Sequence, residues 1–296
     1  MSGFSRSGRL LPASCTSFPV HADAVYNLIF MHSARIVELL QPFLSPCHSS
    51  PGQRPGEESA VLSPTQLDHI STYIDILQRW NARINLTAIR DEDEMVTRHF
   101  GESLFAAQHL FPRRSTLCSP VPALSGAEGS SVSKGFDVAV AQSPKPAARV
   151  ADLGSGAGFP GIPIKLWAPE ISLTLIESNH KKVTFLREII RALTLTNINV
   201  FPARAEHLTA SHPALFDVIT LRAVEHFTEI LPTAATLMAP GGRLALLIGS
   251  SQQTKAHSAL PNLIWHFPIP IPRSTNRILL VAKSLARTSI SLVNKW

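Results

Sequence analysis

The chain has 296 residues, of which 45% are hydrophobic and 16% are charged, so it can bury the core of one large domain or two modest ones. No apolar run approaches the roughly 18 residues of a membrane-spanning helix, and no signal peptide is recognisable, so we expect a soluble cytoplasmic protein. The three cysteines are widely spaced, which argues against a disulfide framework or a zinc site, and we expect no bound metal.

The charge of the chain is unevenly distributed. Its formal net charge is +6, and residues 150–296 hold fourteen Lys and Arg against eight Asp and Glu. A basic surplus is the usual footprint of nucleic-acid binding, although many basic proteins bind no nucleic acid.

The first 60 residues show little regular pattern. Residues 44–60, LSPCHSSPGQRPGEESA, have the composition of turns and linkers. Only SARIVELLQPFL favours a helix, a short one that would begin near Ser33, and Met31 offers an alternative start of translation. We therefore predict that residues 1–60 are a poorly ordered lead with one possible short helix.

Residues 61–111 are predicted to form a small helical N-terminal module. Ser63 and Gln66 have the spacing of a capping box at the start of a helix. Apolar residues then recur at helical spacing, at Leu67, Ile70, Ile74, Leu77, Trp80 and Ile84. After a break at RINLTAIRDEDE, Asp91 or Asp93 can cap a second helix through MVTRHFGESLFAAQHL.

Residues 112–148 differ from both neighbours. They are rich in Pro, Ser, Gly and Ala and show no sustained period, so we predict an inserted flexible loop.

From residue 149 onward the pattern alternates between strands and helices. Strands are expected at 149–153, 172–177, 198–203 and 216–223, then in RLALLIG after a PGG turn at 240–242, with further candidates in LIWHFPI and RILLVAK. Helices are expected at 162–167, at 181–193 and through FTEILPTAATLM. This alternation predicts an α/β fold with a mostly parallel central sheet and a ligand site at the carboxyl ends of its strands.

The run RVADLGSGAGFPG (149–161) places four glycines directly after the first of these strands. A P-loop would end in Gly-Lys-Ser/Thr, which is missing here. The dinucleotide pattern G-x-G-x-x-G is not matched either, and Pro160 removes an amide that could hold a phosphate. S-adenosylmethionine is favoured by Asp152 before the glycines, by Glu177, whose carboxylate can accept ribose hydroxyls at the end of the second strand, and by the later FDVI and PGG. Residues 149–296 are therefore predicted to be a Rossmann-like class I methyltransferase domain that binds S-adenosylmethionine.

A closer resemblance follows from two longer stretches, LQRWNARINLTAIRDEDEMVTRHFGES (77–103) and DLGSGAGFPGIPIKLWAPE (152–170). They resemble the RsmG/GidB family, and LIESNHKKVTFLREI, ARAEHL and FDVITLRA continue the match in order. The elements W-N-x-x-x-N-L-T and R-H-F are its specific part. The resemblance covers roughly residues 62–111 and 147–285. It implies methylation of guanine N7 in 16S ribosomal RNA (guanine 527, in the 530 loop), with the small ribosomal subunit or its precursor as partner.

The resemblance and the residue patterns together give a set of candidate site residues. The cofactor-binding candidates are Gly154, Gly156, Phe159, Glu177, Ala205, Glu206 and Arg222. The candidates for positioning the acceptor are Arg204, Arg222 and His99. The candidates for RNA binding are Asn85, Arg98, Lys181 and Lys182.

No catalytic acid or base is expected. Guanine N7 has a lone pair and bears no proton, so methyl transfer to it needs neither a general base nor a metal, and catalysis depends on positioning and electrostatics. Arginine is the usual partner of guanine N7 and O6, which is why the arginines of the set are candidates for base or phosphate contact.

One residue departs from the family pattern, and two alternatives stay open. Ile248 stands where the family usually carries a lysine, directly before the glycine that ends the fifth strand. A NAD(P)-dependent oxidoreductase on a similar sheet is one alternative, and a non-catalytic ribosome-binding module is the other. We expect a monomer.

Overall fold

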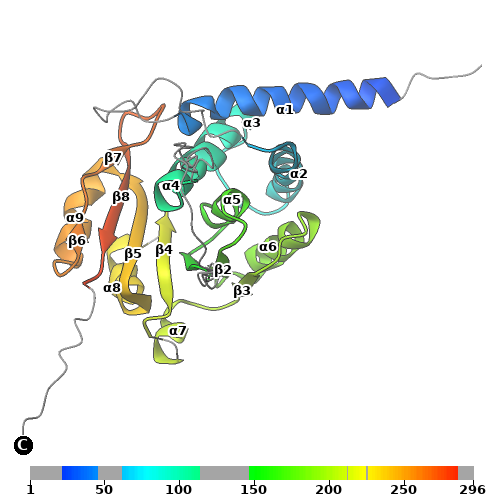
Figure 1. Ribbon diagram of the computed structural model, residues 1–296. Coiled ribbons are helices and arrows are strands. Elements are labelled where there is room, and N and C mark those ends of the chain that lie inside the picture. The colour runs from blue at the N-terminus through cyan, green and yellow to red at the C-terminus, as the bar shows by residue number, and fades with distance from the viewer. Residues whose placement is uncertain (1–21, 46–61, 114–146, 212, 225, 286–296) are drawn as a thin grey trace, which may run out of the picture.

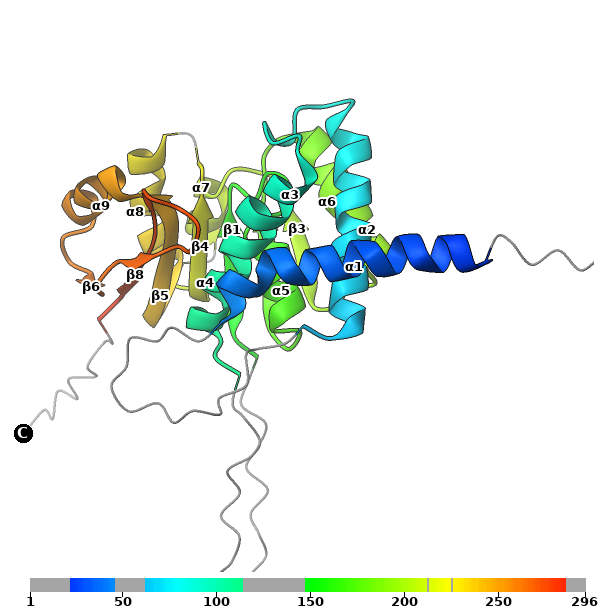
Figure 2. The ribbon, with the colours of Figure 1, turned by 90° about the horizontal axis from the view of Figure 1, so that it is seen from above.

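The computed structural model describes residues 22–45, 62–113, 147–211, 213–224 and 226–285 (Figures 1 and 2). Much of the predicted lead and most of the predicted inserted loop lie outside the described residues, as do the three cysteines. Among the described helices, none combines the length and the hydropathy needed to span a bilayer.

One sheet of eight strands forms the centre of the protein (Figure 1). Its strands are β1 (Arg149–Leu153), β2 (Ser172–Ile176), β3 (Ile198–Phe201), β4 (Phe216–Arg222), β5 (Met238–Gly249), β6 (Ile264–Trp265), β7 (Ile269–Pro270) and β8 (Arg277–Lys283). Their order is β3-β2-β1-β4-β5-β8-β6, with β7 paired to β8; β1 to β5 are parallel and β8 is antiparallel. The strand order reverses between β1 and β4, so the loops after these strands diverge and leave a crevice at their carboxyl ends.

Helices cover both faces of this sheet (Figure 1). They are α5 (Gly161–Trp167), α6 (His180–Ala192), α7 (Glu206–Ser211), α8 (Phe227–Leu237) and α9 (Gln253–Ala259). Alternate side chains of a strand enter opposite layers: Ala245 and Leu247 pack in the layer of α5 and α6, and Leu246 and Ile248 in the layer of α7 to α9. The buried positions of the strands are mostly apolar because both faces of the sheet are covered. Ile248 is 3% exposed in this second layer, so an isoleucine suits the packing at that position.

In the part of the chain that the structure describes, the predicted helical module contains α2 (Pro64–Asn81), α3 (Glu92–Glu94), the π-helix η1 (Met95–Gly101) and α4 (Glu102–Leu110). The helix α1 (Ala22–Leu44) lies in the predicted lead and packs against this module. The capping box is confirmed: the Ser63 amide donates to Gln66 Oε1 at 2.9 Å and the Gln66 amide donates to Ser63 Oγ at 3.2 Å. Asp91 caps the second helical stretch by accepting from the Glu94 amide at 2.8 Å.

Three details differ from the sequence-based expectation. The helix expected to begin near Ser33 begins at Ala22, and its buried residues Ile36 and Leu40 pack in the same core as η1, α2 and α4, across which it lies (Figure 2). The PGG segment is not a turn before the fifth strand but part of β5. Phe216 of β4 pairs with Met238 and Val218 pairs with Arg243, so a bulge in β5 takes up the extra residues. The helices α7 and α9 were not among the expected helices.

The helical module and the sheet share one apolar core on the face of α5 and α6. Hydrogen bonds also join them, among them those from Gln66 Nε2 to the Leu166 carbonyl at 2.5 Å and from Trp80 Nε1 to Glu188 Oε2 at 2.9 Å. The module is therefore packed directly against the domain that carries the glycine-rich loop, while the boundaries at residues 61, 112 and 149 stay predictions.

Candidate cofactor and acceptor site

A cavity of about 260 Å³ lies at the carboxyl ends of the parallel strands. The segments that follow β1, β2, β3 and β4 form its walls, which are lined by Gly154, Ile176, Glu177, Ser178, Ala203, Arg204, Ala205, Glu206, Val224, His226, Glu229 and Ile230. A larger cavity, of about 1230 Å³, lies at the amino ends of the parallel strands, beside Ala148 and Arg243 and away from the glycine-rich loop. Its size does not make it the functional site, because ligands of open α/β sheets bind at the carboxyl ends of the strands.

The glycine-rich loop forms one wall of the smaller cavity. Gly154, Gly156 and Gly158 have φ angles of +68°, +57° and +86°, a conformation that residues with a Cβ rarely adopt. The amides of Gly154 and Ser155 donate to the Ile176 carbonyl at 3.0 and 3.1 Å, which fixes the loop to the end of β2. A Cβ on Gly154 would lie 3.1 Å from Val224 Cγ2 and would narrow the cavity.

Glu177 holds its carboxylate in a fixed position at the cavity wall. Its side chain is buried, and Oε2 accepts from the Gly156 amide at 2.9 Å while Oε1 accepts from the Asn179 amide at 2.8 Å. A carboxylate oxygen can accept more than one hydrogen bond, so both oxygens keep capacity for a ligand. Asn179 in turn caps α6 by accepting from the amides of Lys181 and Lys182.

Asp152 supports the loop from inside the sheet. Thr220 Oγ1 donates to its Oδ1 at 2.7 Å and the Gly161 amide donates to its Oδ2 at 3.1 Å. Complete burial raises the pKa of Asp152 to about 7, although these hydrogen bonds oppose the shift. Asp152 therefore connects β1, β4 and the start of α5, and it does not line the cavity.

The helical module contacts the loop through a stack of rings. Phe159 lies between Tyr73, at 5.2 Å between ring centroids and 6° between planes, and His99, at 4.6 Å and 17°. Phe100 packs edge-on against both Tyr73 and Phe159. The Tyr73 hydroxyl donates to the Ala157 carbonyl of the loop. The shape of the loop therefore depends on residues of α2 and η1.

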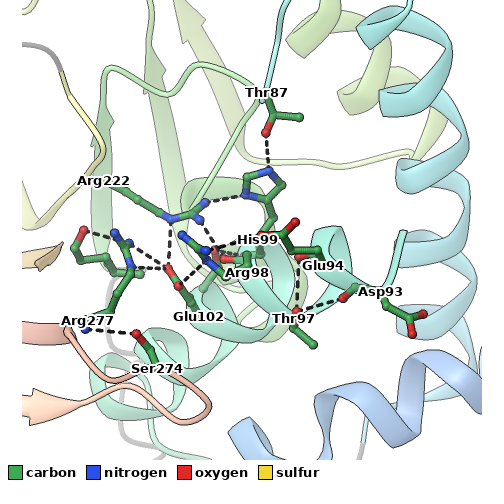
Figure 3. A network of polar contacts seen from close by, with 12 residues as sticks. Thr87, Asp93, Glu94, Thr97, Arg98, His99, Glu102, Arg222, Ser274 and Arg277 are labelled. Carbon is green, nitrogen blue, oxygen red and sulfur yellow. Dashed lines mark hydrogen bonds and ion pairs between the residues drawn. The ribbon is translucent and has the colours of Figure 1, made fainter. Parts of the chain in front are cut away.

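A network of charged residues lies beside this stack (Figure 3). Arg222, at the end of β4, donates from Nη1 to His99 Nδ1 at 3.0 Å and from Nη2 to the Arg98 carbonyl at 2.8 Å. Burial, with Arg222 adding to the effect, lowers the pKa of His99 to about 3, so the imidazole is neutral. Because Nδ1 accepts from a guanidinium, Nε2 carries the proton and donates to Thr87 Oγ1 at 2.7 Å.

The acidic centre of the network is Glu102, whose side chain is 2% exposed. Its Oε2 accepts from Arg277 Nη2 at 2.8 Å and lies 3.4 Å from Arg222 Nε. Its Oε1 lies 3.3 Å from Arg98 Nε. One buried carboxylate thus holds three guanidinium groups at the edge of the sheet where β4 and β5 end.

The structure brings together only part of the predicted site. Gly154, Arg204, Glu177, Ala205 and Glu206 line the cavity, and Gly156 is bonded to Glu177. Phe159, His99 and Arg222 lie together in the ring stack and the charged network, outside the cavity lining. Lys181 and Lys182 lie in the first turn of α6, and Asn85 accepts from Arg90 on an exposed loop. The roles of these residues stay predictions.

Sequence reasoning missed several residues of the site. Tyr73, Glu102 and Arg277 were not singled out, and neither were Val224 and Glu229 of the cavity. The spacing of Arg98 and Glu102, four residues apart on one helical stretch, was a local signal for that ion pair. No comparable signal linked Arg277 to Glu102, because 175 positions separate them.

The fold and the cavity define an α/β domain with a cavity at the carboxyl ends of its parallel strands, where open α/β sheets bind their ligands, next to a helical module. The chain belongs to the family described as GidB, rRNA small subunit methyltransferase G, whose model matches residues 66–119 and 137–266. The "Ribosomal RNA small subunit methyltransferase G" of Roseiflexus castenholzii is 34% identical over 236 residues, which cover 77% of this chain and 87% of that protein. The protein of the same name from Xanthomonas campestris pv. campestris is 36% identical over 177 residues, 60% of this chain and 66% of its own length.

Among solved structures, P. horikoshii TYW2 in complex with MeSAdo aligns at a TM-score of 0.41 and 15% identity, over 47% of this chain and 58% of that one. The family membership does not rest on this alignment. The family model and the two relatives confirm the expected family, the Rossmann-like class I methyltransferase fold, enzymatic function and S-adenosylmethionine as the cofactor. The alternatives of an oxidoreductase and of a non-catalytic module are not supported.

Proposed function

We propose that this chain transfers the methyl group of S-adenosylmethionine to N7 of a guanine in 16S ribosomal RNA, guanine 527 of the 530 loop, in the small subunit or its precursor. The observation that carries the proposal is the placement of Arg222, which ends β4 two residues before the cavity wall at Val224 and contacts His99 of the family-specific R-H-F element. A cytoplasmic location, a monomeric state and independence of metals remain predictions from the sequence.

The cavity suits the proposed cofactor. Ile176, Ala203, Ala205, Val224 and Ile230 provide apolar surface for an adenine ring. The fixed carboxylate of Glu177 can accept the two ribose hydroxyls. The absence of a Cβ at Gly154 leaves room for the ligand beside Val224. When bound, the sulfonium of the cofactor supplies an electrophilic methyl group.

The acceptor side is proposed to work by positioning rather than by proton transfer. A neutral His99 with its Nδ1 occupied by Arg222 is not placed to remove a proton, and guanine N7 bears none to remove. His99 and Glu102 instead fix the direction of the Arg222 guanidinium, a group that can donate to O6 of a guanine and orient its N7. Arg98 and Arg204 are the further candidates for contacts with the base or its phosphates.

The decisive experiment maps the methyl group. Small subunits from a strain that lacks this activity are incubated with the protein and labelled S-adenosylmethionine, and the modified nucleotide is located by primer extension after N7-specific cleavage. We expect one stop, at guanine 527. Label on another atom or nucleotide would contradict the proposed target, and unlabelled RNA would contradict the proposed substrate.

A further inference from the structure

A separate cavity, of about 210 Å³, lies between the helical module and the segment that joins β7 to β8. Phe43 of α1 and three residues of η1 and α4, Thr97, Arg98 and Glu102, form one side. The other side consists of Pro272, Arg273 and Ser274. None of these residues lines the cofactor cavity, yet Glu102 and Arg98 belong to the charged network that reaches Arg222 (Figure 3). The cavity is therefore a distinct site on the acceptor side of the protein.

The charges around this cavity are not balanced. Four arginines, Arg98, Arg222, Arg273 and Arg277, surround two glutamates, Glu94 and Glu102, which leaves a surplus of two positive charges. The nearby Asp93 interacts electrostatically with Arg273 and shares Arg35 with Glu38, so counting these three residues as well lowers the surplus to one positive charge. Glu102 is 98% buried and already shared by three guanidinium groups, so it stabilises them without neutralising them.

The groups on the accessible part of the cavity are hydrogen-bond donors. Arg98 has 46% of its side chain exposed, and its ion pair with Glu94 is long, at 3.5 Å. Arg273 is exposed, in a backbone conformation with φ of +56°. Ser274 Oγ accepts from the Arg277 amide at 3.1 Å, so its hydroxyl hydrogen stays available for donation. The segment that carries Arg273 is held in place by this bond and by the Ile271 amide, which donates to the Arg277 carbonyl at 3.0 Å.

We propose that this cavity binds a phosphate of the RNA substrate, between the guanidinium groups of Arg98 and Arg273 and the hydroxyl of Ser274. Two guanidinium groups and a hydroxyl match a phosphodiester, which bears one negative charge and offers only acceptors. Phosphate contacts fix the register of a nucleic acid without reading its sequence. This site anchors the RNA chain at the edge of the sheet that carries Arg222, and it rests on the proposed function because an RNA chain must pass there.

The salt dependence of RNA binding tests the site. Binding of a labelled transcript of the 530 region is measured by fluorescence anisotropy over a range of salt concentrations, for the wild type and for Arg273→Ala, Arg273→Lys and Arg191→Ala. Loss of one phosphate contact is expected to reduce the slope of log affinity against log salt by about 0.7 and to weaken binding roughly 3- to 10-fold at moderate salt. Arg273→Lys keeps the charge and should keep most of the slope.

Arg191 is the matched control, because it is an exposed arginine in the last turn of α6, at the opposite edge of the sheet. Arg191→Ala should leave affinity and slope unchanged, and all variants should bind S-adenosylhomocysteine as the wild type does. Wild-type binding by Arg273→Ala, or an equal loss in Arg191→Ala, would overturn the phosphate site while leaving the proposed methylation intact. A wild type that neither binds nor methylates the RNA would overturn the proposed function itself, and the phosphate site with it.

Discussion

The Tyr73 hydroxyl offers a direct test of whether the helical module contributes to cofactor binding. Tyr73→Phe removes the hydrogen bond to the Ala157 carbonyl but keeps the ring that stacks on Phe159 at 5.2 Å. Tyr73 is fully buried, so no water replaces the lost donor, and an unpaired buried carbonyl costs about 1 to 3 kcal/mol. The cost falls on the conformation of the glycine-rich loop. If the loop must regain its shape to bind the cofactor, a loss of about 1 to 3 kcal/mol weakens binding roughly 5- to 150-fold.

Calorimetric titration with S-adenosylhomocysteine measures this effect, with the thermal midpoint recorded for each variant. The control is Trp80→Phe, which removes another hydrogen bond between α2 and the sheet domain, from Nε1 to Glu188 at 2.9 Å, without touching the loop. Trp80→Phe should lower the midpoint and leave the affinity unchanged. In turnover, Tyr73→Phe should raise the KM for S-adenosylmethionine more than it lowers kcat. An affinity of Tyr73→Phe within twofold of the wild type, with a midpoint as low as that of the control, would refute the positioning role.

Three further predictions concern single side chains. Glu177→Gln should weaken S-adenosylhomocysteine binding about tenfold in the same titration with RNA affinity unchanged, because a charge-assisted acceptor for the ribose hydroxyls is lost; unchanged cofactor affinity would exclude that contact. The lowered pKa of His99, about 3 in the folded state against about 6.5 unfolded, supplies stability that is complete above pH 6.5 and is lost as the pH falls toward 3. Denaturant unfolding at several pH values should therefore show the wild type losing up to about 1.4 kcal/mol per pH unit more than His99→Gln in that window, and parallel curves would contradict it. Ile248→Lys should lower the free energy of unfolding by a few kcal/mol, measured by urea titration, because it buries an ammonium group; an unchanged midpoint would show that the lysine reaches solvent.

The sequence is informative where one segment determines its own structure. The parallel strands are short apolar runs between helices, and the capping box of Ser63 and Gln66 is local, so both could be predicted. The loop of Gly154 could be located because its glycines follow a strand. Bonds between distant segments leave no such pattern. Tyr73 and Ala157 are 84 positions apart, so the sequence of neither segment predicts their hydrogen bond.

The π-helix is a second feature that the sequence does not predict. Helical periodicity predicts a helix through MVTRHFGES, but it does not show that η1 occupies Met95–Gly101 within it. A π-helix changes which side chains share a face, and here Arg98 and Glu102 form an ion pair while His99 stacks on Phe159. The predicted roles of Arg98 and His99 depend on this placement, which only the packing against the sheet determines.

The helical module supports the glycine-rich loop through direct contacts. Tyr73 and His99 hold Phe159 from both sides, so the residue that follows the last strained glycine is fixed by α2 and η1. Without the module, Phe159 and Phe185, which are 5% and 0% exposed, would face water, and the loop would lose its hydrogen bond from Tyr73. The same η1 segment carries Arg98 toward the acceptor side. Arg98 and His99 are neighbours on one short helical stretch, so an RNA contact of Arg98, as proposed, would couple the position of the RNA to the shape of the glycine-rich loop.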